Sequence, residues 1–68
     1  MGEEMDRDVL LSLEAYKTWV RVFNKYGRDV SKNCRKRHLR RWGRLDMTQK
    51  ETVAGLMNVW TKENPGEG

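Results

Sequence analysis

The chain has 68 residues, which allows one domain at most and only a small core. A single cysteine, Cys34, excludes an intrachain disulfide and any zinc site built from several cysteines. The formal net charge is +4, and no apolar run approaches the ~20 residues that a membrane-spanning helix needs, so we expect no membrane segment.

The composition favours a small folded protein that works inside the cell. Charged residues make up 35% of the chain and are interspersed with 37% apolar residues, which is more typical of a folded domain than of disorder. No segment combines a basic start with an apolar core, as a secretory signal does. We therefore expect an intracellular protein, nuclear if the source is eukaryotic and otherwise cytoplasmic.

The first expected helix covers residues 6–26. Residues 1–5 are an acidic lead that we expect to fray, after which Asp6 can cap the helix. Apolar residues then recur in alternating steps of four and three, which predicts one helical stripe; they are Val9, Leu13, Tyr16, Val20 and Phe23. Gly27 follows as a natural end of the helix.

The second expected helix covers residues 31–42. Residues 28–30 read as a short turn, with Asp29 or Ser31 as the cap and Gly43 as the stop. At 100° per residue, a thin apolar seam lies opposite a thick cationic face; the seam consists of Val30, Cys34, His38 and Trp42.

The third expected helix covers residues 48–62. Thr48 and Glu51 have the spacing of a capping box, and a core stripe follows at Val53, Leu56, Met57 and Trp60. Each helix would contribute one of the three tryptophans. The sequence therefore predicts an all-α fold, a compact three-helix bundle forming a single domain over residues 6–63, with a flexible tail at 64–68.

Positive charge is concentrated in one stretch, residues 31–44. Seven of the fourteen Lys and Arg residues lie there, and no acidic residue does, so this stretch carries +7. The remaining seven basic and ten acidic residues sum to −3, which accounts for the net +4. A concentrated cationic element on a mildly acidic body is the usual footprint of a protein that binds a polyanion.

We interpret the second helix as a nucleic-acid-binding surface. DNA is preferred over RNA, because a stable helix fits the B-form major groove better than the narrow major groove of A-form RNA. Transcription regulation is a role that such a module can serve. The residues expected to contact nucleic acid, mainly through phosphates, are Lys32, Asn33, Lys36, Arg37, Arg40, Arg41 and Arg44.

Other interpretations stay open. The cationic stretch could be a solvated face or a nuclear localisation signal, or could bind an acidic protein surface. A protein-interaction module would dock an apolar or acidic partner through the first or the second helix. The first helix has a second apolar edge for such a partner or for self-association, at Leu11, Ala15 and Val22.

Catalysis and metal binding are not expected. Cys34 and His38 are spaced i,i+4, but two ligands do not make a structural zinc site. With a single histidine and a single cysteine, no third group at a recognisable spacing would orient a catalytic base. No cofactor is predicted.

Two short stretches resemble parts of known DNA-binding families. Residues 32–41, KNCRKRHLRR, resemble the basic region of basic-zipper proteins, but Trp42 and Gly43 end the helix and no leucine heptads follow. One tryptophan per helix and the sequence KYG at 25–27 resemble Myb-type repeats, but the cationic segment comes where that family has an intervening helix. Neither resemblance assigns a family.

Overall fold

The computed structural model describes residues 6–65, and within that range the chain forms three α-helices and no strand. Their bounds are α1, Arg7–Tyr26; α2, Arg28–Gly43; and α3, Met47–Glu63. The predicted all-α three-helix bundle is therefore confirmed. The expected frayed lead at 1–5 and the end of the expected tail at 66–68 lie outside the described residues.

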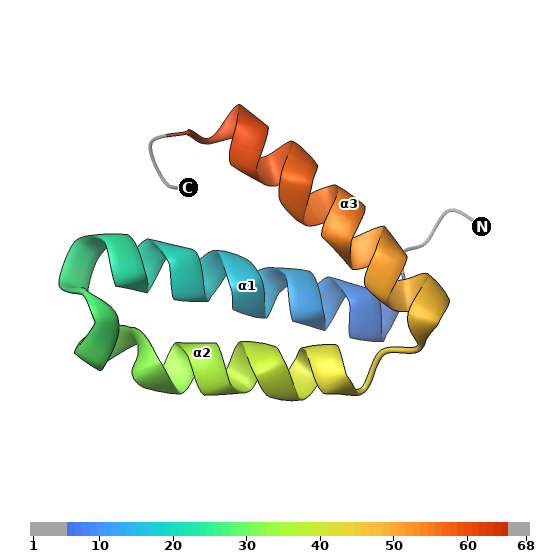
Figure 1. Ribbon diagram of the computed structural model, residues 1–68, viewed down its shortest axis with the longest axis horizontal. Coiled ribbons are helices and arrows are strands. Elements are labelled where there is room, and N and C mark those ends of the chain that lie inside the picture. Colours follow the sequence, from blue (N-terminus) through green and yellow to red (C-terminus); the bar gives the residue numbers. More distant parts are fainter. Residues whose placement is uncertain (1–5, 66–68) are drawn as a thin grey trace.

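Helix α1 is the centre of the fold. It packs against both other helices, and more extensively against α2 than against α3, whereas α2 and α3 barely touch. Figure 1 shows α2 running antiparallel alongside α1, with α3 crossing obliquely on the other side of α1. As a result, the face of α2 that points away from α1 is not covered by another helix.

The start of α1 agrees with the prediction. Asp6 is the N-cap, and its Oδ1 accepts a hydrogen bond from the backbone N–H of Asp8 at 2.8 Å. Its other carboxylate oxygen accepts from Nε2 of Gln49 in the first turn of α3, at 3.0 Å. One side chain thus caps α1 and ties the beginning of α3 to it.

The start of α2 corrects the predicted turn at residues 28–30. Gly27 has a φ of 93° and is both the C-cap of α1 and the N-cap of α2, so one residue makes the connection. This left-handed conformation is readily available only to glycine. Ser31 does not cap the helix; it is buried inside it, and its hydroxyl donates to the carbonyl of Arg28 at 3.1 Å.

The start of α3 corrects the predicted capping box. Asp46, not Thr48, is the N-cap, and Gln49, not Glu51, completes the box. The Gln49 N–H donates to Asp46 Oδ1 at 2.8 Å, and the Asp46 N–H donates to Gln49 Oε1 at 2.9 Å.

The core lies where the start of α1, the end of α2 and the first half of α3 meet. Val9, Leu45 and Val53 form its buried centre, each with 5% or less of its surface exposed. Trp42, Leu56 and Met57 pack around them. The predicted stripe of α3 is confirmed, since Val53 and Trp60 are buried and the other two members of the stripe, Leu56 and Met57, are half-buried.

Two predicted apolar positions prove to be exposed. Phe23, at the end of the predicted α1 stripe, is 45% exposed, because α3 covers mainly the earlier part of α1. Val30, at the start of the predicted α2 seam, is 58% exposed. The other three members of the seam lie on the covered side of α2, with His38 buried and Cys34 and Trp42 half-buried, and Ser31 is buried beside them.

Candidate nucleic-acid interface

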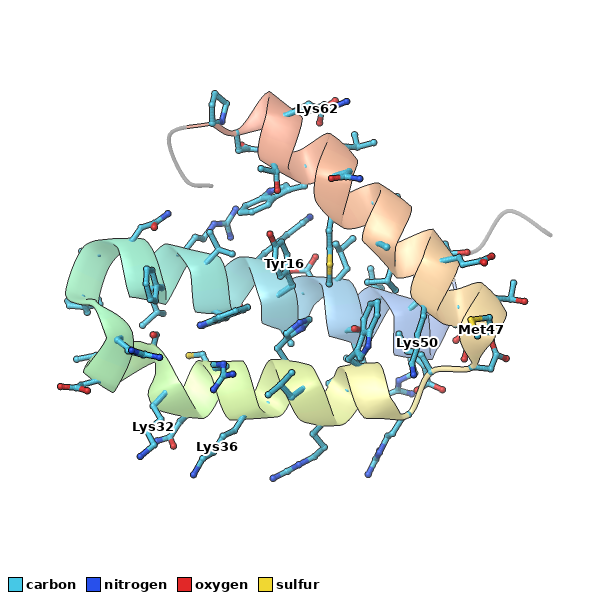
Figure 2. The ribbon with its side chains drawn as sticks, viewed as in Figure 1. Tyr16, Lys32, Lys36, Met47, Lys50 and Lys62 are labelled. Atoms are coloured by element: carbon cyan, nitrogen blue, oxygen red, sulfur yellow. The ribbon has the colours of Figure 1, made fainter. Side chains whose placement is uncertain are left out.

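The outward face of α2, together with its C-cap residue Arg44, carries a row of cations at i,i+4 spacing. Lys32, Lys36, Arg40 and Arg44 are all exposed, and Figure 2 shows Lys32 and Lys36 pointing away from α1 and α3. At 1.5 Å of rise per residue, the row spans about 18 Å along the helix. Asn33, another predicted contact, is also exposed on α2. We call Lys32, Lys36, Arg40 and Arg44 the outward row.

Within residues 6–65, no carboxylate forms an ion pair with a member of the outward row. The ion pair found in that range joins Lys17 Nζ to Glu14 on α1, at 3.7 Å. Like charges at i,i+4 destabilise a helix by a few tenths of a kcal/mol per pair. The row therefore carries a local cost that neighbouring acids do not offset.

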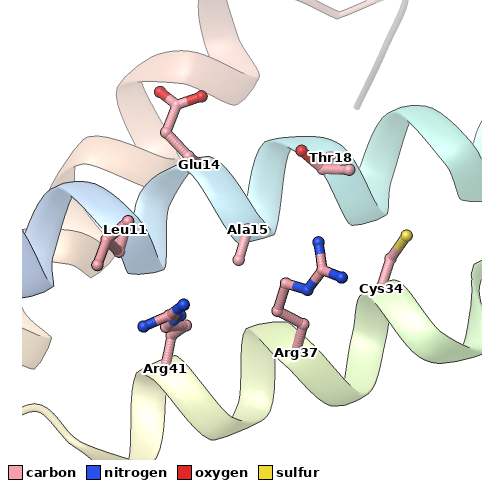
Figure 3. Close-up of a pocket in the computed structure, with 7 residues that line it drawn as sticks. All are labelled: Leu11, Glu14, Ala15, Thr18, Cys34, Arg37 and Arg41. Carbon is pink, nitrogen blue, oxygen red and sulfur yellow. The ribbon is translucent and has the colours of Figure 1, made fainter.

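Two of the predicted contact residues, Arg37 and Arg41, do not lie on the outward face of α2. Arg37 and Arg41 line a groove between α1 and α2, and Figure 3 shows both side chains extending toward α1. Leu11 and Ala15 are among the α1 residues that line this groove. Arg37 is exposed and Arg41 is half-buried, so these cations flank the outward row and do not belong to it.

Two cations that the sequence interpretation left out lie on the other flank. Arg28 and Arg35 are exposed and, together with Lys32, line a second groove against Trp19 and Phe23 of α1. Arg28, Lys32 and Arg35 follow i, i+4, i+7 spacing. That spacing could have been recognised in the sequence if the helix had been started at Arg28.

A network of rings fixes the rotation of α2 against α1. His38 stacks on Trp19, with 5.5 Å between ring centroids and 19° between planes, and lies 5.5 Å from Tyr16. Tyr16 also meets the ring of Trp60 edge to face at 5.9 Å, and His38 lies 6.3 Å from Trp42. These contacts join all three helices, and with His38 facing inward the outward row must face away from α1.

His38 is a titratable side chain inside this network of rings. It is 8% exposed, and burial lowers its pKa below the ordinary value of 6.5. A hydrogen bond with the backbone of Ser12 opposes that shift in part. Its Nδ1 is buried without a hydrogen-bond partner among the described residues, so protonation would place an unpaired N–H and a positive charge between aromatic rings.

We expect the stability of the protein to fall as the pH drops below about 6.5. Below that pH the unfolded chain binds more protons at His38 than the folded chain does. The free energy of unfolding therefore decreases as the pH is lowered, until the pH falls below the pKa of His38 in the folded state. Urea titrations between pH 5 and pH 8 measure this change. The variant His38→Phe should be flat over the same window, and an unchanged slope in that variant would show that another group is responsible.

Two of the three residues of the predicted docking edge of α1, Leu11 and Ala15, line the groove between α1 and α2. Ala15 is buried, with 8% of its surface exposed, and Leu11 and Val22 are half-buried. Most of this edge therefore belongs to the contact between α1 and α2.

Other functional groups are sparse in the described part of the chain. Cys34 is a free, half-buried thiol that lines the same groove as Arg37 and Arg41. Among residues 6–65, no three His, Cys, Asp or Glu side chains come together where they could hold a metal ion. None of the helices in that range has both the length and the apolarity needed to cross a membrane. No protein-family model, curated protein or solved structure matches this chain.

Proposed function

We propose that this protein is a nucleic-acid-binding module that sets the outward row of α2 against the phosphates of DNA. The observation that carries the proposal is the row itself. It consists of three cations on one face of α2 and a fourth, Arg44, at the C-cap, along about 18 Å, uncovered by α1 or α3 and without ion pairs among residues 6–65. In a eukaryotic cell such a module would act in the nucleus, and transcription regulation is a role it could serve.

The shape of the surface suits duplex DNA. An α-helix with its side chains is about 10–12 Å across, and the B-form major groove is about 12 Å wide. Because α2 and α3 barely touch, α2 can approach a groove without a second helix in its way. The narrow major groove of A-form RNA would not admit it, which favours DNA.

The predicted contact residues divide into roles. Phosphates would be contacted by the outward row, with Arg37 and Arg41 available beside it on the groove side. Asn33 is the amide on the exposed part of α2, and a bidentate contact to adenine is a typical use of such a side chain. Most of the affinity would be electrostatic, and sequence preference would be weak.

The test is fluorescence anisotropy of a labelled DNA duplex over a range of salt concentrations, with an RNA hairpin measured in parallel. Four phosphate contacts predict that log K falls with log salt with a slope of about −3.6, at 0.9 per phosphate. Tighter binding of the hairpin would reverse the preference for DNA. Absence of binding to either at low salt would overturn the proposal.

A protein-interaction module is the second candidate, and one observation favours it. Leu39 is 49% exposed on α2, on the same helix as the outward row. An apolar side chain amid cations suits an amphipathic acidic partner. Leu39→Ala would weaken such a partner and leave phosphate binding unchanged, which separates the two candidates.

A further inference from the structure

The second groove between α1 and α2 combines aromatic and cationic walls. Trp19 and Phe23 of α1 line one side, and Arg28, Lys32 and Arg35 of α2 line the other. The groove has a volume of about 610 Å³, compared with about 220 Å³ for the groove beside Arg37 and Arg41. It is therefore the roomier of the two spaces that flank α2.

The aromatic wall offers one fixed ring and one exposed ring. Trp19 is held by stacking on His38 and by an edge-to-face contact with Tyr16 at 6.2 Å. Phe23, one helical turn further along α1, is 45% exposed. An exposed ring beside a fixed one is the kind of platform on which unpaired bases stack.

The cationic wall is continuous with the outward row. Lys32 belongs to both, while Arg28 and Arg35 turn the positive surface toward the groove. The groove also has one acid, Asp29, so its charged lining is three cations against one carboxylate. A strand whose phosphates follow the outward row would pass the mouth of the groove at Lys32.

We propose that this groove accepts an unpaired base, stacked on Phe23 beside Trp19, from a strand whose phosphates lie along α2. The preferred ligand is then a duplex with a single-stranded extension, not a blunt duplex. This inference rests on the proposed function and narrows its ligand class. The charge of the groove suits a phosphate backbone, and the exposed ring suits a base.

The experiment compares a blunt DNA duplex with the same duplex carrying a short single-stranded extension, both measured by anisotropy with the whole chain. The wild type should bind the extended duplex about tenfold more tightly, as expected for stacking of one base. Phe23→Ala should abolish that preference and leave the affinity for the blunt duplex within about twofold.

The matched control is Tyr26→Ala. Tyr26 is an exposed aromatic on the same helix, 58% exposed, and it does not line the groove. This variant should keep the full preference. Placing 2-aminopurine in the extension provides a second readout, because its fluorescence should be quenched by the wild type and by Tyr26→Ala but not by Phe23→Ala.

Failure of this inference can be told apart from failure of the proposed function. Equal binding of the two duplexes with a steep salt slope would overturn the base site alone. An equal loss of both affinities in Phe23→Ala, with unchanged circular dichroism, would overturn it as well. A third outcome would assign the groove to a protein partner instead. In it, an acidic helical peptide binds the wild type but not Phe23→Ala, and does not displace the extended duplex from the wild-type protein.

Discussion

Replacing Lys36 and Arg40 together by glutamate should lower the affinity for duplex DNA about a hundredfold or more at low salt. Both residues lie in the middle of the outward row, and both are exposed. Two lost charge-assisted phosphate contacts at about 1.5 kcal/mol each already amount to about 3 kcal/mol, or two orders of magnitude. The introduced carboxylates repel phosphates and add to that loss.

The same double variant should remain fully folded. Neither side chain packs in the core, and the change converts two of the three like-charge pairs in the outward row into attractive ones. Helical circular dichroism and the urea midpoint should therefore match the wild type or improve on it. A fall in the urea midpoint would mean that the two cations contribute to the stability of the fold. A loss of DNA binding could then not be attributed to lost phosphate contacts.

A matched variant separates the position of the charge from its amount. Arg7→Glu with Lys62→Glu also changes the net charge by −4, from +4 to 0, but alters exposed positions on α1 and α3. Figure 2 shows Lys62 on the side of the molecule opposite Lys32 and Lys36. If this control lost as much affinity as the α2 variant, binding would depend on overall charge and the outward row would not be the interface.

The helices themselves could be predicted because their signals are local. Asp6 followed by an apolar stripe, and the i, i+3, i+4, i+7 set from Val53 to Trp60, depend only on residues within a few turns. The structure confirms the Asp6 cap and the burial of Val53 and Trp60. Features that depend only on the pattern within one helix could therefore be predicted from the sequence.

The starts of α2 and α3 were not predicted correctly, because several local solutions compete at each of them. Thr48 with Glu51 and Asp46 with Gln49 both satisfy the spacing of a capping box. The second pair forms, and Gln49 gains a further bond to Asp6 that lies 43 residues away in the chain. Such a long-range contact is not visible in the periodicity of one helix.

The candidate site could be predicted only in part, because the grouping of its cations also depends on packing between helices. The concentration of charge identified α2 directly, but starting the helix at residue 31 left Arg28 outside it and hid its spacing with Lys32 and Arg35. The orientation of Arg37 and Arg41 toward α1 depends on how α2 is rotated, and the burial of Ser31 and His38 sets that rotation. The sequence pattern therefore predicted that α2 is cationic. Which of its cations face outward depends on how α2 packs against α1.

Trp60→Ala should largely unfold the protein. Trp60 is 8% exposed and meets Tyr16 at 5.9 Å, while the guanidinium of Arg21 lies 5.7 Å from its ring centre. Replacing a buried tryptophan by alanine costs about 3–5 kcal/mol, and a core of this size supplies roughly that much net stability. The loss should also reach α2, since Tyr16 contacts His38 as well.

Circular dichroism and urea titration measure this effect, with Val59→Ala as the control. Val59 is adjacent in α3 but 51% exposed, so its truncation should leave the midpoint unchanged. A cooperative transition at the wild-type midpoint in Trp60→Ala would show that α3 does not contribute to the folding unit.

The destabilised variant also links folding to binding. A ligand that binds only the folded state stabilises it by about 2.7 kcal/mol at a hundred times its Kd. Duplex DNA at that excess should therefore restore much of the helical signal of Trp60→Ala, because the outward row is intact in that variant. The same DNA should not rescue Trp60→Ala combined with the Lys36 and Arg40 reversals. Equal rescue of both would mean that the DNA stabilises the chain through some surface other than the outward row.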